Sequence, residues 1–261
     1  MIRHLGRKQT SNNADWLYAM EHIADFISAD EVDAYADEAV SNIRAASAGK
    51  HAAFAWSGGK DSIVLASLCE RAGVNEGYFA YCDLDYPEFV KWCSDNKPAC
   101  VEMMHTGYGL EWLAKHQELI FAEGLIGQRW HQISQRGPFT RMYFDKKLDV
   151  LIVGHRVIDG NNCGKDGYIR KKSGEVRYTP IADWPHEIVL GYIHYHNLSL
   201  PPIYGWKDGF VIGTHAWPER EFCKTLEQGY REVYKIDPSI IISAADYIQS
   251  ARHFLETEVS V

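Results

Sequence analysis

The chain has 261 residues, of which 46% are hydrophobic and 13% aromatic, and its formal net charge is −8. A chain of this length buries one large core or one domain with appendages, and we expect one α/β domain with helical additions. The acidic balance argues against a general nucleic-acid-binding surface, because such a surface needs an excess of basic residues.

Membrane and secreted proteins are two further classes that the sequence does not favour. No apolar run reaches the roughly 18 residues that span a bilayer, and residues 1–8 lack the apolar core of a signal peptide. We therefore expect a cytoplasmic protein without a membrane partner. The cysteines form no CxxC pair and are few for this length, so we expect reduced thiols rather than a disulfide framework: Cys69, Cys82, Cys93, Cys100, Cys163 and Cys223.

Residues 1–47 are predicted to form an N-terminal helical extension. Apolar residues recur at helical spacing from 14 to 27 and again from 32 to 43, which is typical of two amphipathic helices. An alternation of strands and helices follows from 48 to 205, and we predict that it forms a single α/β domain. Residues 206–261 are predicted to form a mostly helical C-terminal extension.

A glycine turn joins the first predicted strand to a helix. The apolar run 51–56 leads into Ser57-Gly58-Gly59-Lys60-Asp61-Ser62, and a helical pattern leads out of it. Paired glycines let the backbone approach a ligand closely, and the N–H groups of a new helix point at any anion bound there. Lys60 adds a positive charge, and Asp61 adds a carboxylate that can hold a metal ion or cap the helix. The sequence therefore predicts a phosphate site formed by Ser57, Gly58, Gly59, Lys60, Asp61 and Ser62.

The spacing of this turn differs from a Walker A loop, which has four residues between its first glycine and Gly-Lys-Ser/Thr. The hexapeptide resembles instead the PP-loop of the ATP pyrophosphatases, also called adenine nucleotide alpha hydrolases. Its Lys-Asp-Ser ending is similar to that of the phosphoadenosine phosphosulfate (PAPS) reductase branch. The resemblance implies a Rossmann-like fold and a loop that holds the pyrophosphate of ATP, with chemistry at the α-phosphate. We call residues 57–62 the PP-loop.

The alternation of elements continues after the PP-loop. Apolar patterns predict a helix that Gly73 ends, strands at 77–82, near 100–105 and at 150–153, and a helix near 87–94. Strands joined by helices form parallel sheets, so we predict a doubly wound, mostly parallel α/β fold. Tyr86-Pro87-Glu88 follows the second strand and resembles the Phe-Pro-Glu of the PAPS reductase family. That resemblance implies a binding role for Glu88.

A second motif follows the strand at 150–153. Gly154-His155-Arg156-Val157-Ile158-Asp159 brings an arginine to the predicted crevice mouth, where a guanidinium binds phosphate or sulfate bidentately. The motif resembles the Gly-x-Arg-x-x-Glu-Ser of the PAPS reductase family, with Asp159 and Gly160 at the positions of Glu and Ser. The resemblance implies that Gly154, Arg156 and Asp159 bind the nucleotide.

Positive charge is concentrated around and beyond this motif. Nine Lys/Arg and five Asp/Glu lie between Arg141 and Arg177. The segment 160–177 is therefore interpreted either as a lid or acceptor site or as an ordinary basic loop. The candidate acceptor or lid residues are Arg170, Lys171 and Lys172.

A third match concerns the fold. The segments 179–184 and 200–204, with a helical pattern between them, are similar to the family's Pro-Ile-x-Asp-Trp, helix, Leu-Pro-x-x-Pro-Leu-Tyr segment. The residues alone also fit a helix cap at Asp183 and a packed Trp184. Together the three matches run from about 37 to 205 in the order that the family has.

Two departures from the family bear on the chemistry. PAPS reductases share a C-terminal Glu-Cys-Gly-Leu-His whose thiolate attacks the sulfur, whereas no cysteine follows Tyr230 here. Some related proteins carry Gly-Cys-x-x-Cys-Pro, and this chain has Thr214 and Trp217 at the two cysteine positions. We therefore expect no iron–sulfur cluster.

The first functional hypothesis is an enzyme that binds ATP and Mg²⁺ at the PP-loop, releases pyrophosphate and adenylylates an unidentified acceptor. Its expected catalytic residues are Lys60, Asp61 and Arg156, with Asp61 as the Mg²⁺ ligand. One alternative is a PAPS or adenylylsulfate reductase, or a related sulfur-transfer enzyme, that uses a thiol of Cys163 or of a partner protein. Another is a nucleotide-binding module without turnover. A homo-oligomer or a partner protein is compatible with each.

Overall fold

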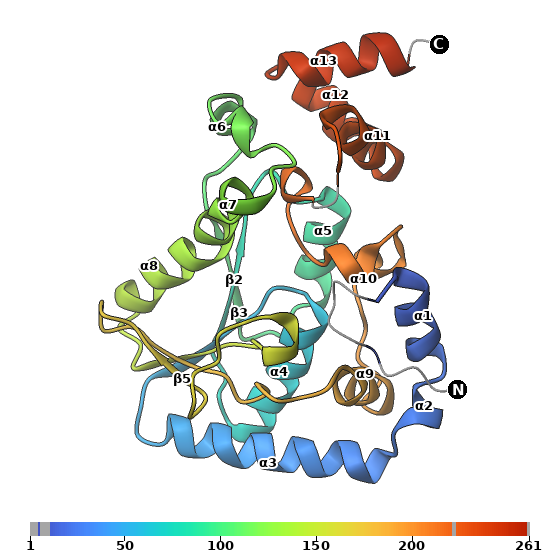
Figure 1. Cartoon of the computed structure of the whole chain (residues 1–261). Coiled ribbons are helices and arrows are strands. Elements are labelled where there is room, and N and C mark those ends of the chain that lie inside the picture. Colours follow the sequence, from blue (N-terminus) through green and yellow to red (C-terminus); the bar gives the residue numbers. More distant parts are fainter. Residues whose placement is uncertain (1–4, 6–10, 221–222, 260–261) are drawn as a thin grey trace.

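The computed structural model describes residue 5, residues 11–220 and residues 223–259. Most of the chain start, for which we predicted no signal peptide, lies outside the described residues. The described part is built around one six-stranded sheet with helices on both faces (Figure 1). It is the doubly wound α/β fold that the sequence predicts.

The strands lie in the order β3-β2-β1-β4-β6-β5. Neighbouring strands are parallel, except that β5 and β6 are antiparallel. The chain crosses the sheet after β3, so β1 and β4 are neighbours although they lie far apart in the sequence. The bounds are β1 (Ala52–Ala55), β2 (Gly77–Tyr81), β3 (Val101–His105), β4 (Val150–Ile152), β5 (Tyr168–Arg170) and β6 (Val176–Tyr178).

Helices make up most of the remaining described chain. The α-helices are α1 (Asn13–Glu21), α2 (Ile23–Phe26), α3 (Ala29–Ser47), α4 (Lys60–Ala72), α5 (Pro87–Asn96), α6 (Leu110–Ala114), α7 (Gly124–Gly127), α8 (Gly137–Asp145), α9 (His186–Tyr195), α10 (Gly209–Ile212), α11 (Leu226–Ile236), α12 (Pro238–Ala245) and α13 (Gln249–Phe254). Short 3₁₀ helices include Val157–Asp159, Pro202–Gly205 and Trp217–Glu219, and π-helices span His131–Arg136 and Leu255–Val259.

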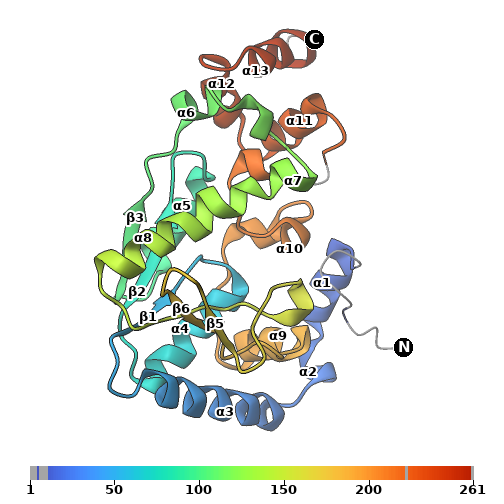
Figure 2. The ribbon, with the colours of Figure 1, turned by 60° about the vertical axis from the view of Figure 1, so that its left-hand side comes forward.

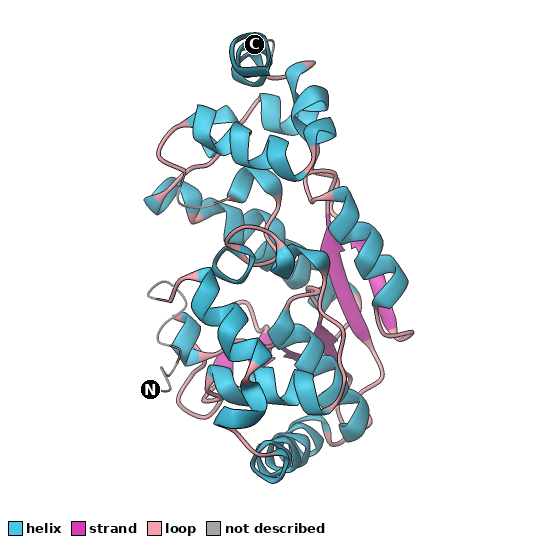
Figure 3. Ribbon diagram, turned by 90° about the vertical axis from the view of Figure 1, so that its right-hand side faces the viewer, coloured by secondary structure: helices cyan, strands magenta, loops and turns pink. Residues whose placement is uncertain are grey.

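The two faces of the sheet bury different helices, because successive residues of a strand point to opposite sides. On one face, Ala53 and Leu151 pack in a small core with Phe139 and Met142 of α8. On the other face, Phe54 belongs to the main core, which also includes residues of α3, α4, α5 and α9. Figure 2 shows α8 crossing the strands, and Figure 3 shows helices on either side of the magenta strands.

The N-terminal helices differ in one respect from the sequence prediction. The helix expected from 14 to 27 is divided into α1 and α2 at His22, and Ile27 is extended. The extended backbone leads into Ser28, whose hydroxyl accepts the Glu31 N–H at the start of α3. An N-cap residue needs non-helical dihedrals, so the start of α3 prevents α2 from continuing.

The hairpin of β5 and β6 was missed by the sequence analysis. It lies inside the segment that was interpreted as a lid, an acceptor site or a basic loop. Each strand has only three residues, which is too short for an alternating pattern to be recognised. In addition, Glu175 and Arg177 are buried as an ion pair, so charged residues stand where a strand pattern has apolar ones.

The C-terminal helices α11, α12 and α13 pack on one another at one end of the molecule (Figure 1). Phe121 contacts Trp217 and Tyr230, which joins α11 to the rest of the chain. The domain boundaries near residues 47 and 205 stay predictions. None of the helices in the described ranges is both long enough and apolar enough to cross a membrane.

Candidate active site

The PP-loop lies at the topological switch point of the sheet. It joins β1 to α4, and the motif 154–159 follows β4, which is the neighbouring strand. Both segments begin at the carboxyl ends of their strands, where open α/β sheets bind ligands. The two motifs that the sequence analysis identified therefore meet at one place.

Hydrogen bonds within the PP-loop hold its turn. The Ser62 hydroxyl accepts the Ser57 N–H at 3.0 Å and donates to the Gly59 carbonyl at 2.8 Å. Ser57 Oγ lies 3.1 Å from Ser62 Oγ and accepts the Gly59 N–H at 3.4 Å. Both serines therefore shape the loop, which is a role that the sequence analysis did not assign to them.

Two glycines allow the close packing of this region. Gly58 has a φ of +66°, and a Cβ there would lie 2.6 Å from Cys93 Sγ of α5. A side chain would thus be strained by the backbone and would also clash with its neighbour. A Cβ on Gly154 would lie 3.2 Å from the Asp61 carbonyl oxygen, so this glycine lets the end of β4 approach the first turn of α4.

Lys60, Asp61, Arg156 and Asp159 form one chain of ion pairs. Lys60 Nζ lies 2.7 Å from Asp61 Oδ2, and Arg156 Nε lies 2.9 Å from Asp61 Oδ1. Arg156 Nη2 lies 2.9 Å from Asp159 Oδ2. The Lys60 side chain is 5% exposed and that of Arg156 is 0% exposed. Because buried charges are stable only when they are paired, these contacts fasten the PP-loop to the second motif.

Arg156 does not lie at the crevice mouth, where the sequence analysis placed it. Its Nη1 donates to the Trp184 carbonyl at 3.1 Å, and its Nη2 lies 3.0 Å from Nδ1 of His186. Together with the two carboxylates, these contacts engage Nε, Nη1 and Nη2 with protein groups. The buried position of Arg156 depends on contacts with the segment after β6, and no local sequence pattern around Arg156 reveals those contacts. The arginine joins three segments of the chain rather than presenting its planar fork to solvent.

The geometry of Asp61 does not fit its predicted role as a Mg²⁺ ligand. One carboxylate oxygen is paired with Lys60 and the other with Arg156. Mg²⁺ needs oxygen ligands that are not already held by cationic side chains. The described residues also contain no group of three or more acidic, histidine or cysteine side chains placed to hold a metal ion. We therefore assign no step to a metal ion bound at Asp61.

Aromatic residues from outside the predicted site cover Lys60. Lys60 Nζ lies 5.5 Å from the centre of the Trp16 ring, which stacks on Phe210. The Tyr204 hydroxyl accepts the Lys60 N–H at 2.8 Å. In the sequence, Tyr204 was recognisable only as a marker of the fold, and Trp16 had no predicted role at the site. The Leu-Pro-Pro-Ile-Tyr segment was the available signal for Tyr204, whereas nothing in α1 pointed to the PP-loop.

Asp183 does not cap α9, although its spacing suggested a cap. The residue before the helix is Pro185, which offers no side-chain hydrogen bond. The segment 179–184 contributes backbone instead, because the Ala182 carbonyl accepts the Val157 N–H at 2.9 Å and the Trp184 carbonyl accepts from Arg156. The segment 179–184 therefore supports the motif 154–159 through direct hydrogen bonds.

His155 lies close enough to Asp61 of the PP-loop and to several basic side chains for their charges to act on it. Burial lowers its pKa to about 4, and the positive charges of Arg177, Arg136 and Lys171 act in the same direction, while Asp61 opposes them. The imidazole is therefore neutral near pH 7. Because the ring is neutral, it adds no further positive charge to those of Arg136, Lys171 and Arg177.

We expect His155→Gln to make the protein more resistant to acid. Between the unfolded pKa of 6.5 and the folded pKa of about 4, the unfolded wild type binds more protons, so its free energy of unfolding falls as the pH falls. Each pH unit over which this difference in bound protons persists lowers the free energy of unfolding of the wild type by about 1.4 kcal/mol. Glutamine does not titrate, so the variant does not have this loss. Urea unfolding of both proteins at about pH 7 and about pH 5 measures the effect. Equal losses in the two proteins would contradict the assignment.

Other residues predicted for the site are not brought to the PP-loop. Glu88 is exposed at the first turn of α5, and its neighbour Phe89 is the residue that packs against Gly58. Arg170 pairs with Asp166 at 2.9 Å, and Lys171 pairs with Glu175 at 2.7 Å. These ion pairs are made within residues 166–175, and Lys171 Nζ also donates to Thr140 Oγ1 of α8 at 3.3 Å.

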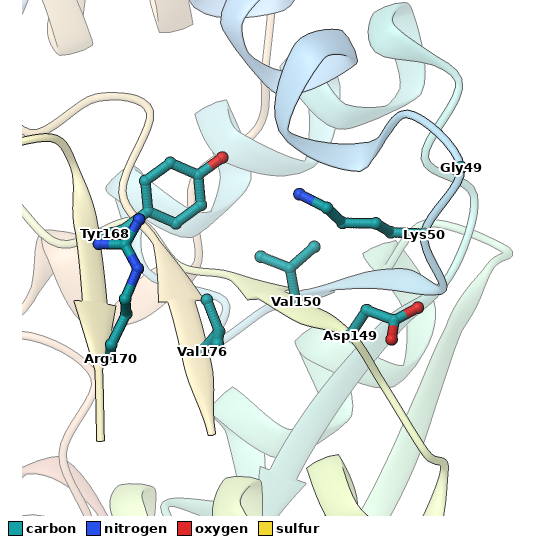
Figure 4. Close-up of a pocket in the computed structure, with 7 residues that line it drawn as sticks. All are labelled: Gly49, Lys50, Asp149, Val150, Tyr168, Arg170 and Val176. Carbon is teal, nitrogen blue, oxygen red and sulfur yellow. The ribbon is translucent and has the colours of Figure 1, made fainter. Parts of the chain in front are cut away.

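Arg170 instead lines a cavity of about 550 Å³ where β1 and β4 begin (Figure 4). The cavity is also lined by Lys50 and Asp149, which precede β1 and β4. The PP-loop follows the opposite, carboxyl end of β1. The structure thus separates Arg170 from the candidate site, and Lys172 is exposed on the hairpin turn.

The cysteines carry no sign of an activated thiol. Cys163 and Cys223 are 3% and 6% exposed. Burial raises the pKa of Cys163 and raises that of Cys223 to about 11. Cys93, beneath Gly58, likewise has a pKa raised by burial. Because the thiolate is the nucleophile, these environments disfavour thiol chemistry in this conformation.

Comparisons with known proteins agree with the motifs and the fold. A family model described as the phosphoadenosine phosphosulfate reductase domain matches residues 51–214. The phosphoadenosine 5'-phosphosulfate reductase of Xanthomonas euvesicatoria pv. vesicatoria (strain 85-10) is 21% identical over 101 residues, which are 38% of this chain and 41% of that protein. The match thus spans less than half the length of this relative.

Among solved structures, the phosphoadenylyl-sulfate (PAPS) reductase from Candida auris, in a phosphate complex, is similar with a TM-score of 0.51 and 14% identity. The alignment covers 73% of this chain and 96% of that one, and it shows a shared fold. The NH3-dependent NAD synthetase from Campylobacter jejuni has a TM-score of 0.45 and 16% identity, over 85% of this chain and 96% of its own. Because the family model covers more than half of the sequence, this chain belongs to the phosphoadenosine phosphosulfate reductase domain family.

Proposed function

We propose that this chain is an enzyme that binds ATP with its Mg²⁺ at the PP-loop, breaks the α–β bond and transfers the adenylyl group to an acceptor. The observation that carries the proposal is the position of the glycine turn and Lys60. They stand at the N-terminus of α4, beyond the carboxyl end of β1 and beside β4. A helix N-terminus and a lysine both attract a polyphosphate at this point of an α/β sheet.

The proposed step is an in-line displacement. An oxygen of the acceptor attacks the α-phosphorus, the bond to the β-phosphate oxygen breaks, and pyrophosphate leaves. The acceptor hydroxyl proton passes to solvent. Lys60 is the catalytic residue in this scheme, because its ammonium stabilises the negative charge that moves onto pyrophosphate.

Arg156 is a positioning residue in the same scheme. It holds Asp61, which in turn pairs with Lys60 and so fixes the direction of the ammonium group. The Lys60 N–H is bonded to the Tyr204 hydroxyl. A phosphate oxygen that binds this N–H has to replace that hydroxyl, and Lys60 has to emerge from beneath Trp16. Nucleotide binding therefore includes a rearrangement of these two aromatic side chains.

A second candidate function is the reduction of a sulfonucleotide, which is favoured by the family and by the names of the relatives. In that reaction a thiolate attacks the sulfur of the nucleotide, the bond from sulfur to the phosphate oxygen breaks, and a thiosulfonate forms. A second thiol then attacks the thiol-derived sulfur of the thiosulfonate, which releases sulfite and leaves a disulfide. The buried cysteines with raised pKa values count against a thiol of this chain. A thiol of a partner protein is the remaining source.

A test of the proposed function is the conversion of ATP labelled in its α-phosphate. The purified protein is incubated with this ATP, Mg²⁺ and a small-molecule extract of cells, and products are examined by mass spectrometry. We expect pyrophosphate and a new compound that is heavier by one adenylyl group. ATP binding without any pyrophosphate would instead identify a nucleotide-binding module without turnover.

A further inference from the structure

The N-terminal helix α1 covers the PP-loop in this structure. Lys60 Nζ lies 5.5 Å from the centre of the Trp16 ring, and the Trp16 side chain is fully buried. The Lys60 side chain is only 5% exposed. The ammonium group that would attract a polyphosphate is therefore enclosed, and a residue from outside the sheet forms part of the enclosure.

A second group of the PP-loop is occupied at the same time. The Lys60 N–H lies at the first residue of α4 and donates to the Tyr204 hydroxyl at 2.8 Å. The N–H groups of a first helical turn have no partner within the helix, and they are the groups that bind a phosphate. The backbone donor and the ammonium group of Lys60 are thus both engaged by other parts of the chain.

One aromatic stack links the two residues that cover Lys60. The Trp16 ring is stacked on Phe210 with 5.5 Å between the ring centres, and the Phe210 ring centre lies 4.6 Å from that of Tyr204. The Asn13 side-chain oxygen accepts the Phe210 N–H at 2.9 Å, which ties the start of α1 to α10. A movement of α1 away from α10 would therefore uncover Lys60 and remove one side of the stack that supports Tyr204.

The attachment of α1 is suited to such a movement. It packs against α9 and α10 beside the edge of the molecule (Figure 1), and a break at His22 separates it from α2. On its outer face, Leu17 and Tyr18 are 47% and 58% exposed. The helix is therefore held mainly through one face, and the break at His22 is a place where a hinge can absorb a change of backbone angles.

The covered arrangement also contains an unsatisfied polar group. The Trp16 Nε1–H is buried and has no hydrogen-bond partner among the residues that the structure describes. A buried donor without an acceptor destabilises the conformation that contains it. This cost favours a conformation in which the indole N–H reaches solvent or an anion.

We propose that α1 is an autoinhibitory cap, closed in this structure, which has to move away at His22 before a polyphosphate binds at Lys60. The identity of the ligand rests on the proposed function, whereas the opening of the cap does not. The apparent affinity for the ligand is the affinity of the open form reduced by the fraction of molecules that are open. Weakening the cap therefore raises the apparent affinity while the groups of the PP-loop stay intact.

Two variants weaken the cap in different ways. Trp16→Leu keeps an apolar side chain in α1 but removes the ring over Lys60. Asn13→Ala removes the bond to Phe210 from a partly buried position, so it loosens α1 without changing a residue of the core. Leu17→Ala is the matched control, because it shortens an exposed side chain of the same helix.

The first measurement needs no nucleotide. Amines are acetylated with sulfo-N-hydroxysuccinimide acetate, and the rate of labelling at Lys60 is followed by peptide mass spectrometry. We expect labelling to be about fivefold faster or more in Trp16→Leu and Asn13→Ala, and unchanged in Leu17→Ala, because a larger fraction of open molecules exposes the amine. Lys146, whose side chain is 40% exposed, is the internal reference and should react equally in every protein.

The second measurement is calorimetric titration of the same proteins with ATP and Mg²⁺. We expect the two cap variants to bind about fivefold more tightly or better, and Leu17→Ala to bind like the wild type. A melting curve establishes that each variant is folded. Unchanged labelling of Lys60 in the folded cap variants, or faster labelling with unchanged ATP affinity, would overturn the proposal. Faster labelling in the cap variants without ATP binding by any of the proteins would support the cap and contradict only the proposed function.

Discussion

Replacing Arg156 by alanine is expected to lower the free energy of unfolding by about 3–5 kcal/mol, because it leaves buried carboxylates without their cation. Asp61 would lose one of its two cationic partners described above, and Asp159 would lose the partner that lies 2.9 Å away. The Trp184 carbonyl would lose a donor as well. Urea unfolding of wild type and variant at pH values near neutrality measures the difference directly.

Arg156→Lys should be nearly as damaging as Arg156→Ala. A single ammonium group cannot reach Asp61, Asp159 and Trp184 together, whereas the planar guanidinium does so from Nε, Nη2 and Nη1. Arg170→Ala is a matched control, because Arg170 forms an exposed pair with Asp166. That pair should contribute little to stability, because solvent screens it. Near-wild-type stability of Arg156→Lys would mean that only the charge matters.

Lys60→Met is expected to reduce the turnover of ATP by about a hundredfold or more, since it removes the cation proposed to stabilise the leaving pyrophosphate. Methionine keeps an apolar chain of similar length beneath Trp16, so the packing loss is small. Lys60 is buried and paired with Asp61, so the variant should also lose some stability.

The measurement for Lys60→Met combines calorimetric titration with ATP, the rate of pyrophosphate release and a melting curve. Lys146→Met is the control, because Lys146 also combines an ion pair, with Glu102, and an aromatic contact, 5.2 Å from the centre of the Tyr78 ring. It lies at the end of α8 and should bind ATP like the wild type. Unchanged ATP affinity in a folded Lys60→Met protein would show that the PP-loop does not depend on this lysine.

The parts of the site that the sequence predicted are those encoded locally. A strand, a glycine turn and a helix follow one another without interruption around residues 57–62, so the PP-loop and its helix could be placed from the sequence alone. The parallel sheet followed from the alternation of strands and helices. The neighbouring positions of the two motifs at one edge then followed from the rule for ligand sites in such sheets.

The parts that the sequence could not predict depend on contacts between distant segments. Arg156 is buried because Trp184 and His186 approach it from the segment after β6. Trp16 covers Lys60 because α1 packs beside α9 and α10. Arg177 of the short strand β6 forms a buried pair with Glu175, which precedes that strand, and the stability of the pair depends on tertiary contacts rather than on strand propensity.

The central claim is that this chain cleaves ATP and does not use its own cysteines for sulfur reduction. The most direct measurement compares pyrophosphate release from ATP with sulfite release from PAPS plus thioredoxin, in the wild type and in a Cys163→Ser, Cys223→Ser double variant. We expect pyrophosphate release from both proteins and no sulfite from either, because both thiols are buried and protonated. Sulfite release by the wild type that disappears in the double variant would contradict it.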